Sequence, residues 1–322
     1  MRVAFLGLGA IGAPMARHLA RAPFELAVWN RTAAKAEAFV RDNPAARMAS
    51  SPADAARGAA VVITCLPTSH EVEALLGGPD GLIAGLGRGA AFADCTSGDP
   101  ATSRRIAARL AEHGVSFVDA PVSGGVIGAE QGKLTVMVGG GAADLERVRP
   151  ALDAFAGKIV HCGEVGAGDA LKAMNNALLA IHVWTTAEAL VVLEKAGVKA
   201  AVALDVINAS SGRSNTSMNL FPERVLTRAF PRTFRLALLD KDIAIAADVA
   251  REQRVPAPVM QLTAELMRMA HQQLGEEADH VEAAQILEAW GGRQIGVDRV
   301  PAAPHESTDA ELRAEQTLEQ PL

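Results

Sequence analysis

Short apolar runs alternate with amphipathic stretches over the first half of the chain. Each apolar run is four or five residues long and bounded by turn residues, which is typical of buried strands. The runs are residues 3–6, 26–29, 61–65, 91–94, 115–118, 134–138 and 158–161. Stretches with helical spacing of apolar positions lie between them, as at residues 33–40 and 102–113. This alternation predicts a doubly wound α/β domain with a mostly parallel sheet.

The pattern changes near Gly163. Residues 167 to about 195 form one long stretch that is apolar nearly all round, which indicates a helix buried between domains or subunits. Further helical stretches follow without a strand-like run, at residues 200–209, 234–251, 258–274 and 281–290. We therefore expect an α/β domain over residues 1–162 and an all-helical domain over residues 163–296.

Composition narrows the class of protein. The 322 residues are 49% hydrophobic and 21% charged, an ordinary globular balance. A net charge of −6 gives no reason to expect nucleic acid or an anionic membrane as a partner. No apolar run looks long and uninterrupted enough to span a bilayer. Residues 297–322 are rich in Pro, Ala, Glu and Asp, and we expect a disordered tail there.

The chain has three cysteines and no tyrosine. Cys65, Cys95 and Cys162 have no metal-ligand spacing, and each falls near the end of an expected strand. We interpret them as small buried hydrophobes in a reducing, cytoplasmic setting, and we expect no metal. The lack of tyrosine excludes mechanisms that need a tyrosine general acid.

Glycines follow the first apolar run at a characteristic spacing. Gly7-Leu8-Gly9-Ala10-Ile11-Gly12 comes directly after residues 3–6 and opens a helical stretch. In this context Gly7 permits a tight turn, Gly9 lets the backbone approach a pyrophosphate, and Gly12 allows close helix packing. The spacing indicates a dinucleotide-binding Rossmann domain, and it argues against a signal peptide at this end of the chain.

The second strand is followed by Asn30-Arg31-Thr32, without an acid. An NAD enzyme usually places Asp or Glu there, whereas an arginine and a hydroxyl suit a 2′-phosphate. We therefore expect NADP in preference to NAD. Leu66-Pro67-Thr68 and Cys95-Thr96-Ser97 each follow a strand, so both loops should line the nicotinamide end of the cofactor site.

Three further segments carry candidate chemistry. Ser123-Gly124-Gly125 exposes successive N–H groups that can hold a carboxylate, although an ordinary loop has the same composition. Lys172 and Asn176 are four residues apart and share a helix face, and both the helix dipole and burial favour a neutral lysine that exchanges protons. Lys241-Asp242 is either a surface charge cluster or a cation for a substrate carboxylate.

These motifs occur in the order found in the β-hydroxyacid dehydrogenases, and the resemblance covers about residues 1–296. Within the family the chain is most similar to the 3-hydroxyisobutyrate dehydrogenases, on the evidence of Trp29–Thr32, Asp119–Gly125 and Ile207–Asn215. The resemblance implies a small hydroxy acid as substrate. It also implies a helical substrate domain, and a homodimer or homotetramer packed through the long helix.

The resemblance implies roles for individual residues. Lys172 would be the catalytic acid/base and Thr96 would lie beside the nicotinamide. Lys241 would lie near the reacting end, in contact with substrate and cofactor. The residues expected to contact substrate are Ser123, Gly124, Gly125 and Asn176.

Several alternatives share parts of this pattern. The chain is too short for the helical domain of 6-phosphogluconate dehydrogenases, and Asn175 stands where they have histidine. Imine reductases and the non-catalytic, chromatin-binding branch of the superfamily lack the lysine that Lys172 represents. Residues 128–133 resemble a P-loop, but the spacing is one residue short and Leu134 replaces Ser or Thr. Close relatives reduce tartronate semialdehyde, succinic semialdehyde or sulfonated aldehydes, so the substrate stays open.

Overall fold

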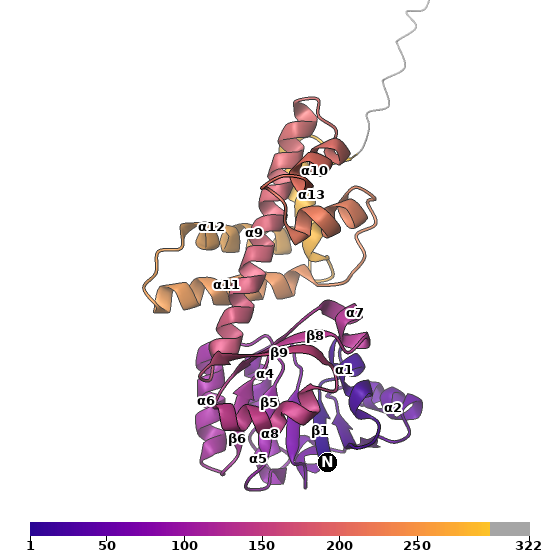
Figure 1. Ribbon diagram of the computed structural model, residues 1–322, viewed down its shortest axis with the longest axis vertical. Coiled ribbons are helices and arrows are strands. Elements are labelled where there is room, and N and C mark those ends of the chain that lie inside the picture. Colours follow the sequence, from indigo (N-terminus) through magenta and orange to yellow (C-terminus); the bar gives the residue numbers. More distant parts are fainter. Residues whose placement is uncertain (297–322) are drawn as a thin grey trace, which may run out of the picture.

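A computed structural model describes residues 1–296, and the tail expected at 297–322 lies outside the described residues. The molecule has an α/β part and a helical part, and one long helix runs from the first into the second (Figure 1). This long helix is α9, Ala167–Lys195.

The α/β part is built on one sheet with the strand order β3-β2-β1-β4-β5-β6-β8-β7, and β9 pairs with β8. Strands β1 to β6 are mutually parallel, whereas β8 is antiparallel to β6 and β7. The mostly parallel, doubly wound sheet is confirmed. The strands are β1 Arg2–Leu6, β2 Glu25–Trp29, β3 Arg47–Met48, β4 Val61–Thr64, β5 Ala91–Asp94, β6 Ser116–Asp119, β7 Val122–Ser123, β8 Leu134–Gly139 and β9 Ala156–Gly163.

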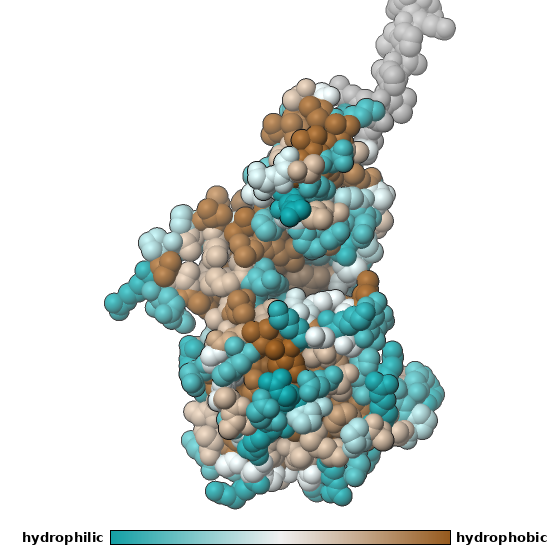
Figure 2. Space-filling model, viewed as in Figure 1, coloured by the Kyte–Doolittle hydropathy of each residue, from teal (hydrophilic) through white to brown (hydrophobic). Residues whose placement is uncertain are grey.

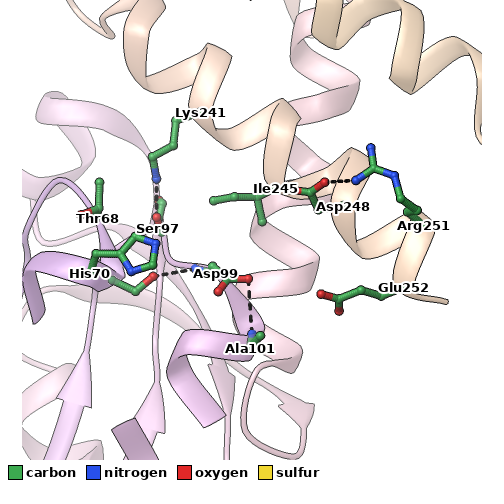
Figure 3. A pocket seen from close by; sticks show the side chains of 11 residues that line it. Thr68, His70, Ser97, Asp99, Ala101, Lys241, Ile245, Asp248, Arg251 and Glu252 are labelled. Atoms are coloured by element: carbon green, nitrogen blue, oxygen red, sulfur yellow. Dashed lines mark hydrogen bonds and ion pairs between the residues drawn. The ribbon is translucent and has the colours of Figure 1, made fainter. Parts of the chain in front are cut away.

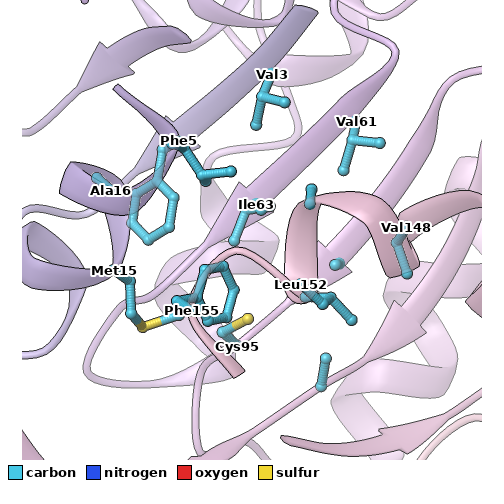
Figure 4. Packing of buried hydrophobic residues seen from close by; sticks show 14 of the residues in the cluster. Val3, Phe5, Met15, Ala16, Val61, Ile63, Cys95, Val148, Leu152 and Phe155 are labelled. Carbon is cyan, nitrogen blue, oxygen red and sulfur yellow. The ribbon is translucent and has the colours of Figure 1, made fainter. Parts of the chain in front are cut away.

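Helices cover both faces of this sheet because side chains alternate along each strand. In β1, Val3 and Phe5 join the core on one face, and Ala4 and Leu6 join the core on the other. Figure 4 shows the first of these cores, where Phe5 and Ile63 lie among side chains from the covering helices. The helices are α1 Gly12–Leu19, α2 Ala33–Asp42, α3 Pro52–Ala56, α4 Ser69–Ala74, α5 Leu82–Gly85, α6 Pro100–Ala111, α7 Gly125–Glu130 and α8 Ala142–Leu152.

Within the described residues the second part is built of helices joined by loops, and its β-structure is limited to one isolated bridge between Arg235 and Asp279. Its core gathers around α9, where Val183 and Leu190 are fully buried. The sequence pattern missed the π-helix η1, which contains Pro222. The elements after α9 are α10 Ala200–Asn208, η1 Thr216–Val225, α11 Leu236–Glu252, α12 Pro258–Leu274, the 3₁₀ helix η2 His280–Ala283 and α13 Ala284–Gly291.

Helix α9 corrects one expectation, since its length and composition would allow it to cross a membrane. Its best 18-residue window has a mean hydropathy of 1.5, and 44% of that window is buried inside the structure. A buried helix at the centre of a helical domain has the same composition, because its neighbours cover several of its faces. Here α11, α12 and α13 pack against α9.

Candidate active site

The glycine loop between β1 and α1 has the geometry of a dinucleotide cradle. A Cβ on Gly7 would lie 2.3 Å from the Cys65 carbonyl oxygen, and one on Gly12 would lie 2.0 Å from the Gly7 carbonyl oxygen. The packing of the chain therefore requires both glycines. A Cβ on Gly9 would meet nothing within 4 Å, so the space above this exposed residue is open. Close backbone approach by a pyrophosphate needs such a space, and the loop fits a dinucleotide.

In the segment after β2, Asn30 forms hydrogen bonds within the protein, whereas the Arg31 side chain is exposed to solvent. The Leu8 N–H donates to Asn30 Oδ1 at 2.9 Å, and Asn30 Nδ2 donates to the Thr32 carbonyl at 3.0 Å. Asn30 thus ties the glycine loop to this segment. The Arg31 side chain is 83% exposed and forms an ion pair with Glu71 of α4 (Nη1 to Oε1, 3.2 Å). Glu71 did not figure in the sequence prediction, because only the fold brings α4 beside Arg31.

Hydrogen bonds hold together the two loops expected at the nicotinamide end. The Leu66 N–H donates to Thr96 Oγ1 at 3.1 Å, and the Thr96 N–H donates to Asp94 Oδ1 at 3.0 Å. Asp94 is buried, which raises the pKa of its carboxyl to about 6. Pro67 is exposed, and Thr68 Oγ1 accepts a hydrogen bond from the Glu71 N–H at the start of α4. Thr96 is therefore a rigid part of the loop.

A cavity of about 510 Å³ lies between this edge of the α/β part and α11. Its volume is in the range of small-molecule sites. Figure 3 shows Thr68, Ser97 and Asp99 on one wall and Ile245, Asp248 and Arg251 on the other. Lys241 reaches across from α11, and its amine donates a hydrogen bond to the Ser97 carbonyl oxygen.

A polar cluster connects α9 with α11. Asn176 Nδ2 donates to Asp242 Oδ2 at 2.5 Å, and Lys241 Nζ lies 2.8 Å from Asp242 Oδ1. Lys172 is 9% exposed and close enough to both charged residues for them to affect its pKa. Burial lowers the pKa of Lys172 and the Lys241 cation lowers it further, whereas Asp242 raises it. The net result is a lysine that gives up its proton more readily than usual.

The fold brings Lys172, Asn176 and Lys241 together, and Asp242 joins them. The sequence placed Asp242 beside Lys241 without giving it a role of its own. Its burial and its bond to Asn176, 66 residues earlier, could not be seen from its position. Within residues 1–296 no hydrogen bond or ion pair of Lys172 Nζ is found, so this buried amine is available to a ligand.

The Ser123–Gly125 turn lies on the side of the α/β part that faces the helical part, where α7 begins (Figure 1). Ser123 ends β7 and pairs with Thr135 of β8. Gly124 and Gly125 are exposed, with φ of 135° and 64°. No hydrogen bond in the described part of the chain joins this turn to Lys172 or Asn176. The same part of the chain contains no group of three His, Cys, Asp or Glu side chains placed to hold a metal ion.

Two family models cover most of the chain. A model described as the NAD binding domain of 6-phosphogluconate dehydrogenase matches residues 2–163. A model described as NAD-binding of NADP-dependent 3-hydroxyisobutyrate dehydrogenase matches residues 166–287.

Curated relatives are similar over nearly their whole length. A 2-(hydroxymethyl)glutarate dehydrogenase of Eubacterium barkeri is 33% identical over 93% of this chain and 91% of its own. A Pseudomonas aeruginosa NAD-dependent L-serine dehydrogenase is 35% identical over 91% of this chain and 99% of its own. A 3-hydroxyisobutyrate dehydrogenase of the same organism is 35% identical over 90% of this chain and 99% of its own.

A solved structure agrees with these relatives. The Mycobacterium tuberculosis 3-hydroxyisobutyrate dehydrogenase with L-serine has a TM-score of 0.82 and 32% identity, and the match covers 89% of this chain and 98% of that one. The glycine cradle, the buried lysine and these matches all agree. The chain belongs to the β-hydroxyacid dehydrogenase family, as an enzyme of the 3-hydroxyisobutyrate dehydrogenase type that acts on CH–OH donors with a nicotinamide cofactor.

Proposed function

We propose that this enzyme transfers a hydride between NADP(H) and a small 3-hydroxy acid, with 3-hydroxyisobutyrate and methylmalonate semialdehyde as the substrate pair. The buried Lys172 side chain, whose amine forms no hydrogen bond or ion pair within residues 1–296, carries the proposal. It lies beside Asn176 and Asp242 and near the Thr96–Ser97 loop, to which Lys241 connects. A buried amine with a lowered pKa is suited to accept a proton from a substrate hydroxyl.

The chemistry divides between the cofactor and the chain. The nicotinamide, when bound, accepts or supplies the hydride. In the oxidation direction, neutral Lys172 removes the proton of the substrate hydroxyl, and in the reduction direction protonated Lys172 returns it. Asp242 holds Asn176 and Lys241 in place at the reacting end. Lys241 supplies positive charge there.

The substrate carboxylate is assigned to the turn at Ser123, Gly124 and Gly125. This turn is exposed on the side of the α/β part that faces α9 and α11, and its backbone N–H groups suit an anion. Other semialdehydes, such as those of tartronate or succinate, or a sulfonated aldehyde, fit the same scheme.

The NADP preference rests on Arg31 and Thr32. Both are exposed at the end of β2, and the segment carries no acid that would hold a ribose 2′-hydroxyl. A guanidinium and a hydroxyl suit a 2′-phosphate. Cofactor choice varies among relatives, since one of them is named as NAD-dependent.

Turnover can be followed by absorbance of the reduced nicotinamide. The purified enzyme would be given NADP or NAD with 3-hydroxyisobutyrate, L-serine, glycerate, 2-(hydroxymethyl)glutarate or 4-hydroxybutyrate. The highest kcat/KM is expected for 3-hydroxyisobutyrate with NADP. A higher kcat/KM for another acid would replace the substrate but leave the reaction class in place, and no turnover of any acid would overturn the proposal.

We further propose that the enzyme is a cytoplasmic homodimer or homotetramer. The support for an oligomer is apolar surface on the helical part, over α9 and near its far end (Figure 2). Three cysteines that form no disulfide agree with a reducing compartment.

A further inference from the structure

Helix α9 begins without a capping side chain of its own. Gly166 precedes it, with φ of 94°, and offers no side-chain acceptor. The acceptor comes from Asp119, at the end of β6. Asp119 Oδ1 accepts the Gly166 N–H at 2.7 Å, and Oδ2 accepts the Asp169 N–H at 2.9 Å. A buried carboxylate in another part of the fold thus caps the helix that carries Lys172, where the helix dipole favours negative charge.

A second buried acid, Asp169, ties the same turn of α9 to the nicotinamide-end loop. Asp169 Oδ1 accepts the Gly98 N–H at 3.1 Å, and Oδ2 accepts the Ser103 hydroxyl at 2.6 Å. Gly98 directly follows Ser97, whose carbonyl oxygen accepts the hydrogen bond from Lys241. The bonds of Asp169 therefore connect α9 to the loop that also contacts α11.

The first turn of α9 also lies very close to the sheet. A Cβ on Gly168 would lie 2.3 Å from the Met137 carbonyl oxygen of β8 and 2.8 Å from Asp119 Oδ2. Lys172 follows Asp169 by three residues, so it lies on the next turn of the helix. The turn that immediately precedes the catalytic lysine is thus held by β6, β8 and the Gly98 loop together.

We propose that Asp119 and Asp169 are positioning residues, which hold the first turn of α9 so that Lys172 Nζ reaches the substrate hydroxyl while the hydride-bearing carbon lies at the nicotinamide. Neither acid touches substrate in this scheme. The inference rests on the proposed role of Lys172 as acid/base.

Burying the carboxyl groups of Asp119 and Asp169 costs desolvation free energy, which argues for a role beyond packing. Burial raises the pKa of Asp119 to about 6, and it raises the pKa of Asp169 well above the usual value. The charge of Asp119 adds to the shift at Asp169, and so does that of Asp94. Apolar residues could fill the same space without this penalty, but they could not accept four hydrogen bonds.

Because the two acids accept hydrogen bonds from different donors, replacement by asparagine should affect them differently. In Asp169→Asn, the amide oxygen still accepts the Gly98 N–H, and the amide nitrogen donates to Ser103, whose hydroxyl rotates. In Asp119→Asn, the amide nitrogen faces a backbone N–H whichever way it turns, so one helix donor stays unsatisfied. Asp169→Ala removes both acceptors. Asparagine should therefore be tolerated at 169 and not at 119.

Steady-state kinetics of the full-length enzyme test this pattern. We expect kcat to fall about 10–100-fold in Asp169→Ala and Asp119→Asn, as small misplacements of catalytic groups do, with the cofactor KM changed less than about 3-fold. Asp169→Asn should stay within about 3-fold of wild type. Ser103→Ala removes the hydroxyl that donates to Asp169 Oδ2 and leaves the Gly98 hydrogen bond in place, so its kcat should be intermediate. This variant keeps the test available if Asp169→Ala does not fold.

An isotope effect separates positioning from loss of folded enzyme. With substrate deuterated at the reacting carbon, the isotope effect on kcat should rise in Asp169→Ala because hydride transfer becomes slower. A smaller fraction of folded enzyme would lower kcat and leave that ratio unchanged. An unchanged isotope effect, or equal losses in Asp169→Ala and Asp169→Asn, would overturn the inference. If Lys172→Ala retains kcat, the proposed function fails instead.

Discussion

The pKa of Lys172 on α9 is set by burial and by two charges of opposite sign on α11. Burial among α9 and α11 lowers it and Lys241 adds to this, while the Asp242 carboxylate stabilises the protonated amine. In the proposed mechanism hydroxyl oxidation needs the neutral amine, so oxidation should lose rate as the pH falls through the pKa of Lys172. Carbonyl reduction needs the protonated amine, so it should lose rate as the pH rises through the same pKa.

Asp242→Asn should move both profiles to lower pH, because it removes the carboxylate that raises the pKa of Lys172. The measurement is kcat/KM against pH in each direction. Asp240→Asn is a matched control, since Asp240 lies on the same helix and bonds His271 instead (Oδ2 to Nδ1, 2.9 Å). A profile that stays in place in Asp242→Asn would show that another group titrates.

Lys172→Ala should lower kcat by about 10²–10⁴-fold, the usual contribution of a positioned acid/base. Binding of the reduced cofactor, followed by its fluorescence, should be almost unchanged. Lys195→Ala, at the exposed end of the same helix, should keep normal turnover. Near-normal turnover in Lys172→Ala would remove the lysine from the mechanism.

The proposed NADP preference rests on Arg31, which forms an ion pair with Glu71 at the surface. Arg31→Asp should weaken NADP far more than NAD, because an acid at the end of β2 repels a 2′-phosphate and accepts a 2′-hydroxyl. Glu71→Gln should do the reverse and improve NADP binding by up to roughly 5-fold, since exposed ion pairs contribute at most about 1 kcal/mol. The measurement is the dissociation constant of each cofactor. Arg41→Asp, which makes the same charge change at the far end of α2, is the control for Arg31→Asp. Equal effects of Arg31→Asp on NADP and NAD would exclude a 2′-phosphate contact.

At the scale of elements, patterning located most strands and helices because each has a local signal. The glycine spacing placed the turn between β1 and α1, and Pro258 marked the first residue of α12. Elements held by tertiary contacts gave no such signal. β3 and β7 have two residues each, too few for an alternating pattern. The cap on α9 comes from Asp119, and 47 residues separate it from Gly166, the first N–H it accepts.

Long-range capping recurs in the helical part, where Asp279 joins the approach to α11 with the start of η2. Its carboxylate accepts the N–H groups of Thr233 at 2.7 Å, Phe234 at 3.0 Å and Val281 at 3.2 Å. Burial alone would raise the pKa of Asp279, but His280 and these N–H groups outweigh it and hold the pKa well below its usual value. The ionised carboxylate therefore stabilises the fold.

Asp279→Asn should lower the free energy of unfolding at neutral pH by roughly 2 kcal/mol, in the range for hydrogen bonds to a charged group. The native pKa is depressed, so the contribution is present above the unfolded pKa of about 3.9 and is lost as the pH falls below it. In denaturant titrations, the difference from wild type should therefore shrink as the pH falls from about 5 to about 3. Asp153→Asn, an exposed acid at the end of α8, should show no such difference at any pH.

At the scale of the whole molecule, the helical part exposes several large apolar side chains, as surfaces that bind a partner do. Along α9, Leu171 and Leu178 are 46% and 51% exposed, and Val192 is 65% exposed. Exposed positions at 171, 178, 185 and 192 recur every seven residues, so they follow one side of the helix. Apolar residues on α10 and α12 are exposed as well, and a second copy would bury such surfaces symmetrically.

If the proposed oligomer packs through α9, Leu178→Glu should shift the enzyme toward the monomer, because it would place a charge in that apolar contact. The molar mass from light scattering during gel filtration should fall to that of one chain, or become dependent on concentration. Ala111→Glu makes the same kind of change at an exposed position at the end of α6, and it should leave the mass unchanged. If the site is complete within one chain, a folded Leu178→Glu monomer keeps its kcat. A monomer that binds the cofactor normally but has lost turnover would mean that the partner copy stabilises α9, and with it the position of Lys172.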